Sequence, residues 1–171
     1  MDWKLIFVLV AFVVYFVYNA VALRLFGVPE SLSMTFYLFK EKKNWLCIWF
    51  PIMMTLMAGA LLPAWLEISE GSNLQFMSFL AASGILFTGA APAFQSSKME
   101  KSVHMTSAIV AAIFAILWVV LVANLWYVIL VWFVAITIIG YMTKSINTSY
   151  IYWLETIAFL STFTAVFAYF V

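Results

Sequence analysis

The strongest constraint in this sequence is a succession of six apolar segments, each about as long as a membrane-spanning helix. They cover residues 3–25, 45–65, 74–94, 103–123, 126–143 and 150–171. A helix needs about 17–25 apolar residues to cross the hydrocarbon core of a bilayer. Backbone groups inside hydrocarbon must find partners within their own segment, so helices are the expected conformation. The sequence therefore predicts an all-α polytopic membrane bundle of six transmembrane helices in a single domain, residues 1–171.

The composition agrees with a membrane location. Apolar residues make up 67% of the chain and charged residues 9%, against about 45–50% and 25% in soluble domains. The net charge of +1 gives no reason to expect a nucleic-acid partner. Cys47 is the sole cysteine, which leaves no intrachain disulfide to form. The expected partners are the lipid bilayer and either another membrane protein or a second copy of the chain.

The positive charges predict the orientation. When the six segments alternate in direction, every lysine and arginine except Lys4 falls on one side. They are Arg24, Lys40, Lys42, Lys43, Lys98, Lys101 and Lys144. Positive charge marks the cytoplasmic side of a membrane protein. Both termini are therefore expected on the non-cytoplasmic side.

A short helix is expected between the first two spans, over residues 31–40. Ser31 is suited to cap it, Leu32, Phe36 and Phe39 form an apolar side, and lysines follow. This pattern is typical of a helix lying in the membrane surface. The alternative is that its serines and Thr35 tuck beneath the bundle.

Small residues predict which helices pack most closely. The third span carries a stripe of Ala81, Gly84, Thr88 and Ala91, and the fourth carries Ser107, Ala111 and Ala115 at four-residue steps. Small residues let helix backbones approach each other in lipid. We expect these two helices to touch in the centre of the bundle, which disfavours a central pore.

Three strongly polar residues stand out inside the spans after loops and ends are set aside. Asn19, His104 and Glu155 all fall in the predicted cytoplasmic third of their helices. Ionisable residues in a membrane usually face the bundle interior and mark functional sites. Histidine changes charge near neutral pH, so His104 and Glu155 are candidates for a proton-titratable site.

Structural roles compete with this interpretation. Glu155 is equally suited to be held by Lys101, Lys144 or a tyrosine hydroxyl, and His104 to cap the fourth helix near Ser102. Asn19 more often bonds between helices than binds a ligand.

Enzyme chemistry has little support in the sequence. A metal hydrolase needs several histidines or carboxylates around its ion, and one histidine with one intramembrane acid does not supply them. We therefore expect no metal and no cofactor. A serine nucleophile needs a base, and pairing His104 with Ser102 or Ser107 follows no recognisable spacing.

Two stretches together resemble a known group. SLSMTFY at residues 31–37 follows the first span, and KSVHMTSA at 101–108 opens the fourth. This order resembles the DRAM/Frag-like small six-helix membrane proteins, with Ser31, Ser33 and His104 at the matching positions. Met34 and Thr35 stand where the resemblance leads one to expect an acid. The resemblance implies the fold more than any activity.

Three functions are consistent with these observations. The leading one is transport, permeation or small-ligand binding at a site near the cytoplasmic face made by Glu155, His104, Asn19, Ser31 and Ser33. The others are an accessory subunit that binds a membrane protein or lipid, and a lipid-modifying enzyme. We expect an integral protein of the bacterial inner (cytoplasmic) membrane.

Overall fold

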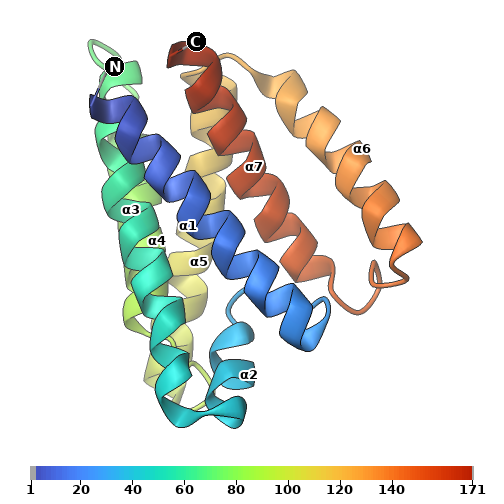
Figure 1. Ribbon diagram of the computed structural model, residues 1–171. Helices are drawn as coiled ribbons and strands as arrows, with labels where there is room; N and C mark the ends of the chain where they lie inside the picture. Colours follow the sequence, from blue (N-terminus) through green and yellow to red (C-terminus); the bar gives the residue numbers. More distant parts are fainter. Residues whose placement is uncertain (1–2, 171) are drawn as a thin grey trace.

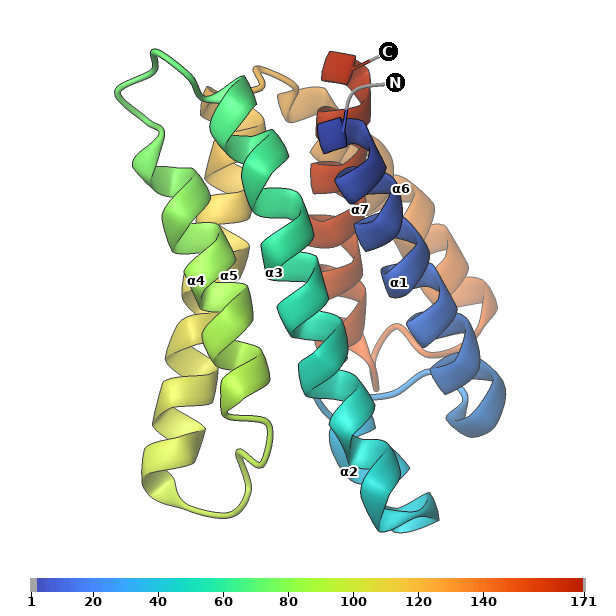
Figure 2. The same ribbon diagram turned by 60° about the vertical axis from the view of Figure 1, so that its left-hand side comes forward.

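The structure, a computed structural model, describes residues 3–170 as a bundle of helices with no strand among them. The elements are α1 (Trp3–Phe26), α2 (Thr35–Lys42), the 3₁₀ helix η1 (Asn44–Ile48), α3 (Trp49–Ile68), α4 (Phe76–Ala90), α5 (Lys98–Leu121), α6 (Trp126–Met142) and α7 (Tyr150–Phe170). The six longer helices alternate in direction (Figure 1). The start of α1 and the end of α7 share one end of the bundle, and α2 lies at the other, which we call the α2 end (Figures 1 and 2).

Four helical stretches are long and apolar enough to cross a membrane. They are Trp3–Phe26, Asn44–Ile68, Lys98–Leu121 and Tyr150–Phe170. α4 and α6 are apolar but shorter, with 15 and 17 residues. The prediction of an all-helical chain with helices able to span a membrane is confirmed for residues 3–170, and the count of six crossings stays a prediction.

α4 is shorter than the segment 74–94 because its ends carry helix-breaking residues. Gly71 adopts a left-handed conformation with φ +74° in the turn before it, which glycine reaches without strain. At the other end, α4 stops at Ala90, two residues before Pro92. A proline disfavours the helical conformation of the residue that precedes it. The chain therefore leaves the helix at Ala91 and forms a loop beside the start of α5.

α5 begins at Lys98, five residues before the predicted start of the fourth span. Ser97 is its N-cap, and the Ser97 hydroxyl accepts a 3.1 Å hydrogen bond from the Glu100 backbone N–H. Ser97 and Glu100 form the S-x-x-E pattern of a capping box. His104 consequently lies inside the second turn of the helix, so the prediction that it caps the fourth helix was wrong.

α4 and α5 touch through their small residues, as predicted. A Cβ added at Gly84 would lie 2.6 Å from the Ala111 backbone nitrogen and 2.7 Å from the Ser107 carbonyl oxygen. Their expected central position was wrong, because α4 makes its main contacts with α3 and α5 alone. α7 takes the central place and contacts α1, α3, α5 and α6. Its sequence of mixed Thr, Ser, Ala and aromatic residues offers buried side chains on several faces.

α5 and α6 do not form the tight hairpin that the single residue Asn124 between the fourth and fifth segments suggests. Asn124 has φ +56°, a left-handed conformation that asparagine tolerates. The turn directs α6 away from α5, and α6 packs mainly on α7 (Figure 1).

The segment 31–40 tucks beneath the bundle. Its helix starts at Thr35, and Leu32, Phe36 and Phe39 are buried in the core together with Ser31, Ser33 and Thr35. The lysines that follow are exposed. Of the two arrangements that the sequence allows, the structure has the one in which the serines and Thr35 enter the bundle.

Candidate functional site

Glu155 of α7 is bound by the backbone of the loop after α1. The Leu32 N–H donates to Glu155 Oε2 at 2.6 Å. Helical turns begin here, since the N–H groups of Met34, Thr35 and Phe36 donate to the carbonyls of Ser31, Leu32 and Ser33. A carboxylate is stabilised at the N-terminal side of such turns by the aligned peptide dipoles. The alternatives that Lys101, Lys144 or a tyrosine holds Glu155 are not what the structure shows.

His104 of α5 is held from both sides of its ring. Nδ1 lies 2.8 Å from the Ala91 carbonyl oxygen and Nε2 lies 2.9 Å from Ser33 Oγ. A carbonyl oxygen only accepts hydrogen bonds, so Nδ1 carries the proton and neutral His104 accepts at Nε2 from the Ser33 hydroxyl. The ring is 2% exposed and stacks on Phe94 with a centroid distance of 4.6 Å.

The two residues meet through the loop rather than directly. Leu32 contacts Glu155 and the next residue, Ser33, contacts His104. Ser31 lies beside them, and its hydroxyl accepts a 3.1 Å hydrogen bond from the Met34 N–H. The structure thus brings together four of the five residues that the sequence placed in one site, although the sequence suggested a pair of His104 with Glu155 and gave Ser33 no partner.

Asn19 belongs to a neighbouring contact between helices. Its side-chain amide donates to the Tyr15 carbonyl at 2.9 Å, and its Oδ1 accepts from the Tyr152 hydroxyl at 3.0 Å. Asn19 lines neither cavity described below. It joins α1 to α7 close to Glu155, and its structure is that of a helix-to-helix hydrogen bond.

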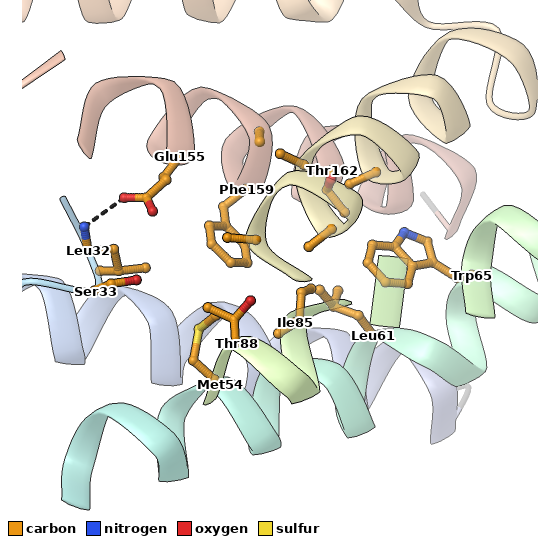
Figure 3. Close-up of a pocket in the computed structure, with 15 residues that line it drawn as sticks. Leu32, Ser33, Met54, Leu61, Trp65, Ile85, Thr88, Glu155, Phe159 and Thr162 are labelled. Carbon is orange, nitrogen blue, oxygen red and sulfur yellow. Dashed lines mark hydrogen bonds between the residues drawn. The ribbon is translucent and has the colours of Figure 1, made fainter. Parts of the chain in front are cut away.

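A small chamber extends inward from Glu155 between the helices. Its volume is about 50 Å³, and Glu155, Leu32 and Ser33 lie at one end while Trp65 lies at the other (Figure 3). The intervening wall is mostly apolar, with Ile85, Leu61 and Phe159 among its residues. We call it the inner chamber. A space of this size admits a few water molecules and no larger ligand.

A larger cavity lies on the outer side of the same residues. It has a volume of about 440 Å³ and shares Ser33, Ala108, Ala112 and Glu155 with the inner chamber. We call it the side cavity. Its rim includes Met105 and Ile109 of α5 and Ile151 and Leu154 of α7, all exposed on the bundle surface. The side cavity therefore opens between α5 and α7 toward the surface that faces lipid.

The side cavity is lined by two acidic residues. Glu155 and Glu30 contribute carboxyl groups, and no lysine or arginine lines the cavity. Glu155 Oε1 has no hydrogen-bond partner within residues 3–170. The remaining polar groups are the hydroxyls of Ser31 and Ser33, the Gln95 amide and the His104 ring. The cavity offers an apolar groove with a polar, acidic inner end.

His104 is positioned by residues for which the sequence predicted no role. The Glu100 carboxylate accepts from the Ala93 N–H at 3.1 Å and from the Ser96 hydroxyl, which fixes the loop between α4 and α5. That loop supplies the Ala91 carbonyl and the Phe94 ring to His104. The capping-box spacing of Ser97 and Glu100 is the signal that could have found this arrangement.

Comparison of the chain with protein-family models, curated proteins and solved structures gave no match. The resemblance to the DRAM/Frag-like group therefore stays a prediction.

Proposed function

We propose that this protein binds a cationic amphiphile in the side cavity, with Glu155 as the counter-ion of its head group. The observation that carries the proposal is the half-buried Glu155 carboxylate at the inner end of an apolar groove that no lysine or arginine lines. An unpaired carboxylate inside a membrane bundle is costly and marks a ligand or ion site. A bound cation supplies the missing partner.

The size and shape of the side cavity support such a ligand. Its volume of about 440 Å³ falls in the range of about 300–1,000 Å³ typical of small-molecule sites. The apolar walls from α5 and α7 suit an alkyl chain, and the serine hydroxyls and Gln95 amide suit a polar head. A ligand can enter sideways from the bilayer because the rim residues are exposed.

Binding is favoured over permeation along the bundle axis. The inner chamber measures about 50 Å³, and at Gly84 the α4 and α5 backbones are in close contact. A continuous water path needs a wider passage than these helices leave. Transport in this proposal is limited to carrying the ligand between the side cavity and one membrane surface.

The proposal includes the orientation and location of the protein in its membrane. Six crossings with both termini on the non-cytoplasmic side place the side cavity at the cytoplasmic face, and the bacterial inner membrane is the proposed location. The support is the distribution of lysines and arginines in the sequence.

The test is competition for crosslinking in lipid nanodiscs. A photoreactive long-chain alkyl trimethylammonium should label peptides of α5 and α7. Glu155→Gln should weaken its binding about 10-fold or more, because it removes a charge attraction of roughly 4 kcal/mol, the value for opposite charges about 4 Å apart near a protein surface. Glu41→Gln, which changes an exposed acid outside both cavities, is the control.

A fatty carboxylate of the same chain length should not compete. Wild-type binding should fall as the pH is lowered and Glu155 becomes protonated, while Glu155→Gln should remove most of this dependence. Glu30 and His104 also line the cavity, so Glu30→Gln and His104→Gln serve as comparisons. Equal affinity of wild type and Glu155→Gln for the cation would falsify the proposal.

A further inference from the structure

We propose that Ser33 and His104 form a nucleophile–base pair that hydrolyses a long-chain acyl ester of a cationic alcohol bound in the side cavity. This inference rests on the proposed ligand site and adds a reaction to it. Its starting observation is that the two chemically reactive groups come from elements far apart in sequence and meet on the cavity wall.

The hydrogen bonds of the His104 ring leave Nε2 free to act as a base. The Ala91 carbonyl holds the proton on Nδ1, which leaves the Nε2 lone pair directed at the Ser33 hydroxyl 2.9 Å away. Nucleophilic serines are activated by an adjacent base that a third group orients. Here the third group is a backbone carbonyl, and the Phe94 ring stacked on the imidazole restricts it further.

The cavity places an ester beside this pair. An acyl chain lying along the α5–α7 groove and a cationic head next to Glu155 would bring the ester carbonyl to the serine-lined inner end. Gln95 Nε2 lines the same space and lies 3.5 Å from Met34 Sδ. A thioether is a weak acceptor, so this amide is available to an oxyanion formed at the carbonyl.

The reaction balances with water as co-reactant. Ser33 Oγ attacks the ester carbonyl carbon while its proton moves to His104 Nε2. The bond from carbon to the alcohol oxygen breaks, and the alcohol leaves with that proton. Water then gives a proton to Nε2 while its oxygen bonds to the acyl carbon. The bond from that carbon to Ser33 Oγ breaks, the proton on Nε2 passes to Oγ, and the fatty acid leaves.

His104 Nε2 contacts Ser33 and not Ser102 or Ser107, the serines of its own helix. Ser107 donates its hydroxyl to the Val103 and His104 backbone carbonyls rather than to the ring. Ser102 is exposed and lines neither the side cavity nor the inner chamber. Ser102→Ala is therefore the matched control for Ser33→Ala.

The test uses the full chain in nanodiscs with palmitoylcholine as substrate. We expect choline release by wild type and by Ser102→Ala, and losses of roughly 100-fold or more in Ser33→Ala and His104→Gln, the size typical of general acid–base catalysis. A fluorophosphonate should add to wild type with loss of fluoride, and mass spectrometry should find it on the peptide containing Ser33. This labelling keeps the test valid if a variant does not fold.

A binding measurement separates the two proposals. The ether analogue of palmitoylcholine cannot be hydrolysed and should compete for the photoreactive trimethylammonium probe. If it binds while wild type releases no choline and takes no label, the hydrolysis is overturned and the binding site stands. If it does not bind, both fail. Equal turnover by wild type and Ser33→Ala overturns the assignment of Ser33.

Discussion

Two groups of buried polar side chains lie toward opposite ends of this bundle, and they differ in what surrounds them. Near the α2 end, His104 and Glu155 bind consecutive residues of one loop and line the side cavity. Toward the other end, the Ser69 hydroxyl donates to the Trp65 carbonyl at 2.7 Å, accepts from Trp118 Nε1 at 2.8 Å and lies 3.0 Å from Ser78 Oγ. We call this second group the Ser69 cluster.

The comparison shows that buried polarity alone does not indicate a site. Ser69, Ser78 and Trp118 line neither the side cavity nor the inner chamber, and their exposed fraction is zero. Their side-chain hydrogen bonds are made to one another and to the Trp65 carbonyl, joining α3, α4 and α5. At the α2 end, Glu155 Oε1 has no partner in the described chain and a cavity adjoins it. An open cavity next to an unfilled acceptor separates a ligand site from a structural contact.

The largest expected effect comes from filling the cavity. Ala112 lines both the side cavity and the inner chamber, and Ala112→Phe places a ring where the alkyl chain should lie. We expect binding of the cationic amphiphile to fall about 30-fold or more, since overfilling a site costs roughly 1–3 kcal/mol or displaces the ligand. Crosslinking competition measures it. Ala20→Phe, on the exposed face of α1, should bind the amphiphile normally. Equal loss of binding in both variants would show that the side cavity is not the binding site.

The second-largest expected effect is a loss of stability with no loss of ligand affinity. Ser69→Ala leaves the Trp118 indole N–H without its acceptor in a fully buried place. We expect the free energy of unfolding to fall by about 1–3 kcal/mol, the cost of an unsatisfied buried polar group. Denaturant titration in mixed micelles measures it. Ligand affinity of the folded fraction should stay at the wild-type value, and a parallel loss of affinity would contradict the division into two groups.

The smallest effect concerns the hydrogen bond between α1 and α7. Tyr152→Phe removes the hydroxyl that donates to Asn19 Oδ1 at 3.0 Å. Hydrogen bonds between helices in membrane proteins average about 0.6 kcal/mol, so the unfolding free energy should drop by about this amount. Affinity for the amphiphile should not change, because neither residue lines the side cavity. A large loss of affinity would instead make Asn19 part of the site.

Much of the bundle could be predicted because its signals are local. Apolar runs of spanning length follow from the need to satisfy backbone groups within hydrocarbon, and the predicted starts of α1, α6 and α7 agree with the structure. The close approach of α4 and α5 follows from the absence of a side chain at Gly84. The early start of α5 was not predicted, because the apolar segment begins at residue 103 while the Ser97–Glu100 capping pattern starts the helix at Lys98.

The partners of the site residues required the tertiary structure. Leu32 meets Glu155 and Ser33 meets His104 across separations of 123 and 71 residues. No periodic pattern in the chain encodes these pairs, because they depend on how far the loop after α1 enters the bundle and on which face of α7 turns inward. The Glu155 contact is also to a backbone N–H, a group that every residue except proline carries.

The sequence by itself determined that the chain is apolar and helical with stretches long enough to span a membrane, and that Asn19, His104 and Glu155 are the strongly polar residues within them once their ends are set aside. Hydrocarbon imposes these properties segment by segment, so they can be read without knowing the neighbours of each helix. The tertiary structure decided that α7 is central, that the serine loop tucks inside and that Ser33 and not Ser102 faces His104. Those outcomes depend on side-chain fit between distant segments, which only the packed bundle defines.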